Sequence, residues 1–188
     1  MGLTMFVVLI AALGGWLSSG LGGRIRGHRL ASAGLALACV SVLFCEPLVA
    51  SAVPRAYPTA VVLAALLLLQ FSRRNLHVPG VPLVAVGLLL NAIVVVANGS
   101  MPVEQMAATR AGGGPVLSAA DRRHVLAGVD TRLRVLDDRV AVPLPGHREV
   151  DSLGDMAIAA GLGLCACTAV RRRRGVFELA APGLLQRA

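Results

Sequence analysis

The side chains best suited to chemistry are few, and the first is Glu46, an acid well inside a long apolar run. A carboxylate within a bilayer is costly unless it is neutral, paired or facing water. Glu46 is therefore a candidate proton or cation site if it lies at membrane depth, and a plain polar residue if it lies near the outer interface. Asn91 stands in a later apolar run, where its amide serves either as a ligand or as a hydrogen-bond partner between helices.

A second set of polar residues has the side-chain types of a hydrolase. The chain lacks the Gly-x-Ser-x-Gly, His-Glu-x-x-His and Cys-x-x-Cys motifs that would support that chemistry. The two serines of this set each stand three residues before an aspartate, and this spacing is typical of a helix N-cap. We therefore interpret these serines as caps and expect no catalytic residue in the set, which comprises Ser118, Asp121, His124, His147 and Ser152.

The four cysteines lie within apolar runs, as Cys39 and Cys45 in one and Cys165 and Cys167 in another. Residues two apart on a helix point to different faces, so the second pair does not converge on a metal ion. A thiol in such a run behaves as a small apolar side chain. We expect no metal site and no cofactor.

The elements that must position these residues are membrane helices. Of the 188 residues, 56% are hydrophobic and 15% are charged, whereas about a quarter of the residues of a soluble domain are charged. The 18 basic residues are all arginine and stand in short clusters beside apolar runs, a pattern of topology determinants. Aromatic residues make up 3% of the chain, which argues against a base-stacking surface and nucleic-acid binding.

Five apolar runs predict an all-α integral membrane protein of about five transmembrane helices. The third run is the shortest, and at about 1.5 Å per residue it falls short of a hydrocarbon core of about 30 Å. The long segment between the fourth and fifth runs (residues 98–151) is mixed in character, and a basic tail (residues 171–188) ends the chain. The predicted spans are residues 3–21, 30–53, 58–71, 81–97 and 152–170.

The arginines predict an orientation in the cell membrane. The first and third connections and the tail together hold ten arginines, whereas the remaining short connection holds only Arg55. The long segment has seven arginines and seven acids, so it carries little weight in the positive-inside rule. We expect the N-terminus outside, the long segment extracytoplasmic and the C-terminus cytoplasmic. The cluster Arg171–Arg174 is a candidate contact for anionic lipids.

The long segment has turn signals of its own. Pro102 predicts the start of a short helix that ends at Gly112–Gly114, and Ser118 predicts a second helix that ends at Gly128. Apolar and polar residues alternate from Thr131 to Val142 around Asp137-Asp138, which predicts a β-hairpin that Pro143 and Pro145 end. We expect this segment to pack on the outer mouth of the helix bundle, with Ser152 and Asp155 capping the last span.

The run Asn98-Gly99-Ser100-Met101-Pro102-Val103 resembles the NG-x-MPV motif of the bacterial DUF5317 family. Further matches follow in the order of that family: Asp130-Thr131-Arg132-Leu133, Leu136-Asp137-Asp138, Val142-Pro143-Leu144-Pro145 and Ser152-Leu153-Gly154-Asp155. Asp137 stands where members of the family commonly have glycine. The resemblance implies a polytopic membrane protein of unknown function and marks the outer loop and the cap of the last span as its distinctive parts.

Two functions stay open at this point. The first is an accessory protein that binds a membrane-protein partner through its outer loop, and the second is a small transporter or ligand-binding protein that uses Glu46 and Asn91. A membrane enzyme is a third and weaker interpretation. The candidate functional residues are Glu46, Asn91, Asn98, Met101, Pro102, Asp130, Arg132, Asp138 and Asp155.

Overall fold

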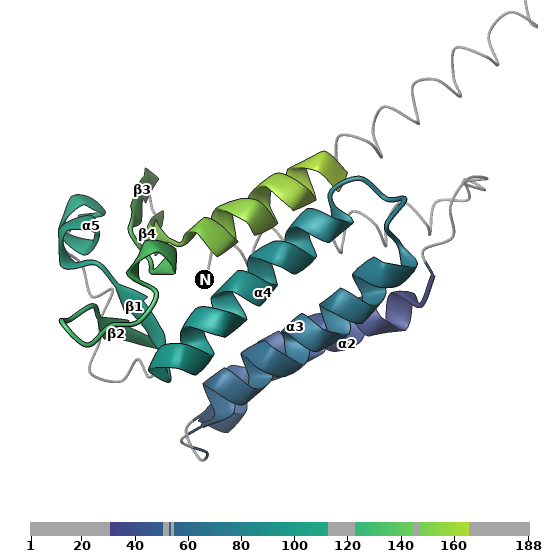
Figure 1. Ribbon diagram of the computed structural model, residues 1–188, viewed down its shortest axis with the longest axis horizontal. Coiled ribbons are helices and arrows are strands. Elements are labelled where there is room, and N and C mark those ends of the chain that lie inside the picture. Colours follow the sequence, from purple (N-terminus) through teal and green to yellow (C-terminus); the bar gives the residue numbers. More distant parts are fainter. Residues whose placement is uncertain (1–30, 51–52, 54, 113–122, 145–146, 166–188) are drawn as a thin grey trace, which may run out of the picture.

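A computed structural model describes residues 31–50, 53, 55–112, 123–144 and 147–165. Four helices form a bundle: α2 (Ala33–Ala50), α3 (Ala56–Arg74), α4 (Val81–Asn98) and an unlabelled last helix, Leu153–Cys165. In Figure 1, α3 lies between α2 and α4, and the last helix lies along the other side of α4. The long segment folds at one end of this bundle, where α4 ends and the last helix begins.

A buried asparagine joins α2 to α3 at the end of the bundle that lies away from the long segment. Asn75, which follows α3, accepts a hydrogen bond from the Ala31 N–H at 2.9 Å and donates to the Ala31 carbonyl at 2.9 Å. Its amide also donates to the carbonyl of Phe71 at 2.8 Å. A side-chain amide that replaces backbone partners in this way fixes the start of α2 against the end of α3.

Glycines let α4 and the last helix approach closely. A Cβ added to Gly87 would lie 2.4 Å from the carbonyl oxygen of Gly154, and one added to Gly80 would lie 2.2 Å from that of Gly161. Gly80 and Gly87 are seven residues apart, as are Gly154 and Gly161, so on each helix the two glycines lie on one face. Small residues of this kind permit backbone contact between helices, and the contact places the N-terminus of the last helix beside the middle of α4.

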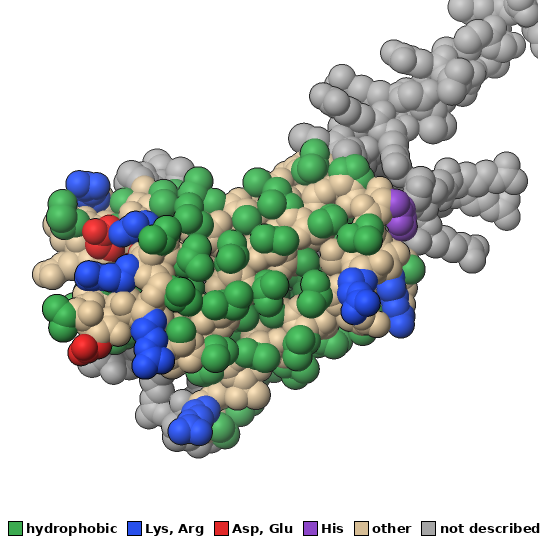
Figure 2. All heavy atoms as spheres, viewed as in Figure 1, with side chains coloured by type: hydrophobic (Ala, Val, Ile, Leu, Met, Phe, Trp, Pro, Cys, Tyr) green, Lys and Arg blue, Asp and Glu red, His purple; other side chains and the backbone are tan. Residues whose placement is uncertain are grey.

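The outer surface of the bundle is apolar. Figure 2 shows hydrophobic side chains over the middle of the visible face, with charged side chains gathered towards the two ends. By length and composition, α3 and α4 are long and apolar enough to cross a membrane, while Ala33–Val49 and Leu153–Cys165 are shorter apolar helices. Five membrane-spanning helices are therefore not supported within the described residues, and the predicted first span, residues 3–21, lies outside them.

The third helix is longer than the sequence predicted. The expected run of residues 58–71 is extended at both ends, and α3 covers Ala56–Arg74 because helical hydrogen bonding continues through polar residues that a hydropathy window excludes. In α4 the predicted bounds of 81–97 agree with the observed Val81–Asn98. Gly99 ends α4 in the left-handed region, with φ of 79°, as a glycine after a helix commonly does.

The described residues are mostly helical, as the expected class requires, and the long segment adds short strands to its helices. It contains β1 (Met101–Val103), α5 (Gln105–Arg110), β2 (His124–Leu126), the 3-10 turn η1 (Arg134–Leu136), β3 (Val140–Leu144) and β4 (His147–Asp151). Strands β1 and β2 pair in parallel, with Met101 opposite His124, and β3 pairs with β4 in antiparallel register, with Val140 opposite Asp151.

Three predictions for the long segment were wrong or shifted. The helix expected to begin at Pro102 begins at Gln105, because Met101–Val103 pairs as a strand. The helix expected to reach Gly128 is contradicted by β2, and residues 113–122, with Ser118 and Asp121, lie outside the described part. The hairpin exists, but it is formed by β3 and β4 rather than around Asp137-Asp138, so Pro143 lies inside a strand.

Two apolar cores hold the described residues together. The larger is the core of the bundle, and Met101 of β1 belongs to it, whereas the smaller comprises Val103, Ala107, Ala111 and Val150. Met101 at the start of β1 lies in the larger core and Val103 at its end lies in the smaller one, so β1 contributes to both cores. This short strand therefore joins the long segment to the bundle.

Candidate functional site at the mouth of the helix bundle

The last helix begins with a reciprocal cap. The Ser152 hydroxyl accepts a hydrogen bond from the Asp155 N–H at 3.0 Å, and the Asp155 carboxylate accepts one from the Ser152 N–H at 3.1 Å. This is the geometry of a capping box, and it confirms the cap predicted for these two residues. Both side chains are buried, so the cap lies inside the molecule and not on its surface.

Asn91 of α4 completes this buried group. Its amide donates to Oδ1 of Asp155 at 2.9 Å, and its carbonyl oxygen lies 2.9 Å from the Ser152 hydroxyl. That hydroxyl also lies 2.8 Å from Oδ2 of Asp155, so its single proton has two acceptors in reach. A Cβ on Gly154 would clash with the Asn91 side chain at 1.9 Å, which shows that the glycine makes room for this contact. Asn91 thus joins two helices.

Asp138 carries the long segment into the same region. Its N–H donates to the Pro102 carbonyl at 2.9 Å, and its own carbonyl accepts from the Glu104 N–H at 2.8 Å, so its backbone continues the pairing of β1. The side chain is 5% exposed. Nε2 of His124 lies 3.8 Å from its carboxylate, which is too long for a hydrogen bond. Among the described residues, Oδ1 of Asp138 has no hydrogen-bond partner.

Burial governs the protonation of Asp138. Desolvation, and then the negative charge of Asp155, raise the pKa of the Asp138 carboxyl to about 8. A buried carboxylate without compensating hydrogen bonds is expected to behave in this way, because low polarity disfavours its charged form. Asp138 is therefore a group that can take up or release a proton near neutral pH.

Glu46 is paired with the long segment. Its Oε2 lies 2.6 Å from Nη2 of Arg123, and the Glu46 side chain is 4% exposed against 25% for Arg123. Its Oε1 has no hydrogen-bond partner among the described residues. Glu46 therefore lies near the end of α2 that faces the long segment, and it forms an ion pair there. Tyr57, at the start of α3, is buried within reach of these charges and those of Asp138 and Asp155.

Together these side chains form what we call the mouth cluster, where all four helices meet the long segment. Four of its members were candidates from the sequence, and four were not chosen. Ser152 had a visible signal in its cap motif. His124 was noted only as one of the hydrolase-type side chains, and neither an apolar pattern nor a motif marks Tyr57 or Arg123. The mouth cluster comprises Glu46, Asn91, Asp138 and Asp155, together with Tyr57, Arg123, His124 and Ser152.

The remaining candidates lie outside the mouth cluster. Asn98 donates to the Val94 carbonyl at 2.9 Å and exchanges hydrogen bonds of 2.8 and 3.0 Å with the backbone of Arg132. Met101 and Pro102 are buried in β1. The side chains of Asp130 and Arg132 are exposed. The asparagine of the NG-x-MPV motif thus anchors a loop, and its methionine and proline are structural.

This arrangement fixes how the long segment packs against the helices. Among residues that the structure describes, no three His, Cys, Asp or Glu side chains are placed to hold a metal ion. Its buried polar atoms mostly face each other across the junction between helices and long segment. Buried hydrogen bonds of this kind favour a single arrangement of the packed elements, because a buried polar atom without a hydrogen bond is costly.

Comparison with known proteins gives one finding. A family model described as a family of unknown function, DUF5317, matches residues 23–167. No curated protein and no solved structure matches the chain.

Proposed function

Because the chain belongs to the DUF5317 family, whose function is unknown, we propose a function from the geometry of its site. The protein is a multi-pass membrane protein that acts as an accessory protein. It binds a partner protein through an apolar loop of its extracytoplasmic long segment. The mouth cluster holds that segment in place on the bundle.

The membrane assignment is supported by the surface of the bundle. Large apolar side chains are exposed along the helices, as at Leu66 (58%) and Val96 (60%). An apolar surface of this kind on packed helices suits lipid rather than water. The orientation follows from the arginine asymmetry: Arg73 and Arg74 lie at the end of α3, and α4 then separates them from the long segment. The segment is accordingly placed outside and the arginines inside.

The observation that carries the functional proposal is the exposure of the stretch that runs from Leu126, the last residue of β2, through the connecting loop to Val135 in η1. Within it Val129 is 93% exposed, Val135 65%, Leu126 50% and Leu133 46%. Contiguous exposed apolar residues commonly mark a protein interface. The loop is not free to bury them, because Asn98 fixes its backbone at Arg132. We call residues 126–135 the apolar loop.

A protein fits this loop better than a lipid surface. Asp130, Arg132 and Arg134 are exposed between the apolar residues, so both signs of charge are present. Mixed charges around apolar contacts give a protein partner its specificity, whereas segments that bind anionic membranes are predominantly basic. The transporter alternative has less support, since Glu46 pairs with Arg123 and Asn91 bonds Asp155.

The test is photo-crosslinking in native membranes. A photoreactive residue at position 129 is expected to give a discrete adduct with another protein, and one at position 86, exposed on α4, is the matched apolar control. Val135→Asp should reduce the position-129 adduct at unchanged abundance of the protein. Adducts with lipid alone, or only with a second copy of this chain, would refute the proposal. Equal adducts from positions 129 and 86 would refute it as well.

A further inference from the structure

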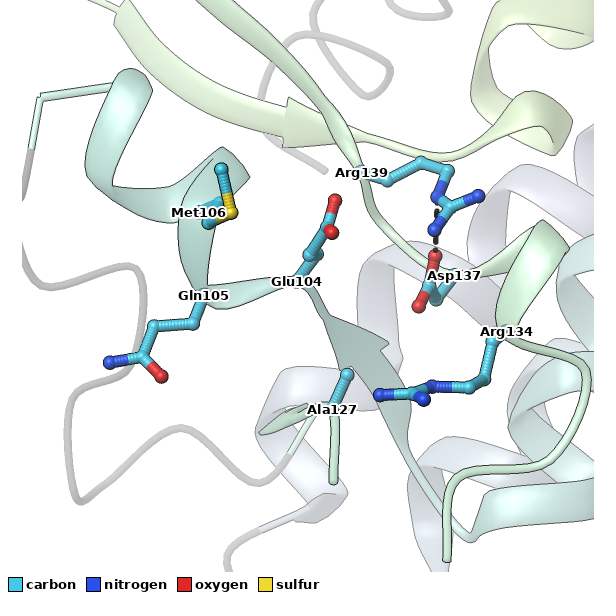
Figure 3. Close-up of a pocket in the computed structure, with 7 residues that line it drawn as sticks. All are labelled: Glu104, Gln105, Met106, Ala127, Arg134, Asp137 and Arg139. Carbon is cyan, nitrogen blue, oxygen red and sulfur yellow. Dashed lines mark ion pairs between the residues drawn. The ribbon is translucent and has the colours of Figure 1, made fainter. Parts of the chain in front are cut away.

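A pocket opens on the long segment, away from the mouth cluster. It has a volume of about 360 Å³ and is lined by the start of α5 (Glu104–Met106), by Ala127 after β2, and by Arg134, Asp137 and Arg139 (Figure 3). Small-molecule sites usually have volumes of about 300–1,000 Å³. The pocket therefore has room for a ligand of a few residues and not for a folded partner.

The four charges of the pocket are not equivalent. Asp137 is 1% exposed and pairs with Arg139, whose Nε lies 3.1 Å from its Oδ1. Figure 3 shows Arg139 folded onto Asp137, while Arg134 extends towards Ala127. Among the described residues, neither Glu104 nor Arg134 forms an ion pair. One negative and one positive side chain thus face the same pocket with their charges unmatched.

The walls of the pocket are held by backbone pairing. The Glu104 N–H donates to the Asp138 carbonyl at 2.8 Å, and the Ala127 N–H donates to the Val103 carbonyl at 2.9 Å. Asp137, buried and paired, supports the wall between Arg134 and Arg139. A binding site whose backbone is fixed before the ligand arrives loses less conformational entropy on binding. Met106, which is 60% exposed, adds an apolar side chain to the pocket.

We propose that this pocket binds a small zwitterion with a free ammonium group and a free carboxylate, namely an amino acid or a short peptide. Arg134 binds the carboxylate, since a guanidinium offers it two parallel N–H donors. Glu104 accepts from the ammonium group, and Met106 contacts an apolar side chain of the ligand. The proposal does not depend on a partner protein at the apolar loop.

Calorimetric titration of the full-length protein in detergent micelles tests the assignment, with alanine and trialanine as probes. At least one probe should bind saturably, with a Kd on the order of 1 mM or below, because charges near solvent attract weakly. Binding of alanine alone identifies an amino-acid site, and binding of trialanine alone identifies a peptide site. Amidating the carboxylate or acetylating the amine should weaken binding about tenfold each.

Variants assign the two ends of the ligand. Arg134→Gln should lower the affinity for the unblocked probe and leave the affinity for the amidated probe unchanged. Glu104→Gln should also lower the affinity for the unblocked probe, and it should leave the affinity for the acetylated probe unchanged. Arg110→Gln, which changes an exposed arginine at the end of α5 outside the pocket lining, is the matched control and should bind the probes as the unmodified protein does. The proposal is overturned if neither probe binds up to about 10 mM, if blocked probes bind as tightly as free ones, or if Arg110→Gln weakens binding as much as Arg134→Gln.

Discussion

Asp138 makes the stability of the protein depend on pH in a direction that can be worked out. Burial raises the pKa of its carboxyl to about 8 in the folded protein, against about 3.9 for an unperturbed aspartate. The folded protein therefore holds this proton more tightly than the unfolded chain does. The contribution of Asp138 to the free energy of unfolding is fully present below the pKa of the unfolded chain and is lost as the pH rises through the pKa of the folded protein. The free energy of unfolding therefore falls between about pH 4 and about pH 8.

The size of the effect follows from the same shift. Within the window, folding takes up nearly one proton at Asp138, which is worth about 1.4 kcal/mol per pH unit. Between pH 5 and pH 7 the free energy of unfolding should therefore fall by at most about 3 kcal/mol. The Asp138 side chain is 5% exposed, so solvent screening reduces this figure little.

Asp138→Asn isolates the effect. Asparagine resembles the neutral acid in shape and cannot ionise, so the variant should match the unmodified protein at pH 5 and be more stable than it at pH 8. The measurement is thermal unfolding in detergent micelles, followed by circular dichroism across this range. Asp130→Asn removes an exposed carboxylate from the same segment and should keep the original slope. An undiminished slope in Asp138→Asn, or no gain in stability at pH 8, would refute the reasoning.

Two further predictions use the same unfolding measurement. Glu46→Ala should lower stability by about 2 kcal/mol, less than for a fully buried pair because a quarter of the Arg123 side chain is exposed. The double variant with Arg123→Met should recover at least about 1 kcal/mol of that loss, and strict additivity would rule out a coupled pair. Gly87→Ala should destabilise by several kcal/mol or separate two helices, because its Cβ would meet backbone at 2.4 Å, whereas Gly163→Ala, with nothing within 4 Å, should be neutral. Equal effects of the two alanines would contradict the helix contact.

The parts of the fold that depend on local sequence could be predicted. Helix α4 runs from Val81 to Asn98 as its apolar run indicated, since an apolar run of this length that ends at an Asn-Gly pair favours a helix over a strand. The Ser152–Asp155 cap was predictable because both partners lie within one helical turn. The DUF5317 resemblance rests on short ordered motifs and is confirmed over residues 23–167.

The parts that depend on distant partners could not be predicted. Asp137-Asp138 has the composition of a turn, but the long segment buries both aspartates, one against Arg139 and one beneath β1, and the hairpin forms later in the chain. Asn91 and Asp155 meet across 64 positions, and no periodicity in the sequence encodes that contact. Hydropathy located the helices, whereas the glycine-to-glycine approach that sets their pairing is invisible until both helices are placed.

The proposed function requires the long segment to face outside the cell, and thiol labelling in intact cells tests this requirement most directly. The four natural cysteines are first replaced by alanine, and single cysteines are introduced as Val129→Cys or Arg73→Cys, both at exposed positions. A membrane-impermeant maleimide should label position 129 in intact cells and position 73 only after permeabilisation, because the arginine-rich connection after α3 is placed inside. Labelling of position 73 in intact cells, with position 129 protected until permeabilisation, would contradict the account.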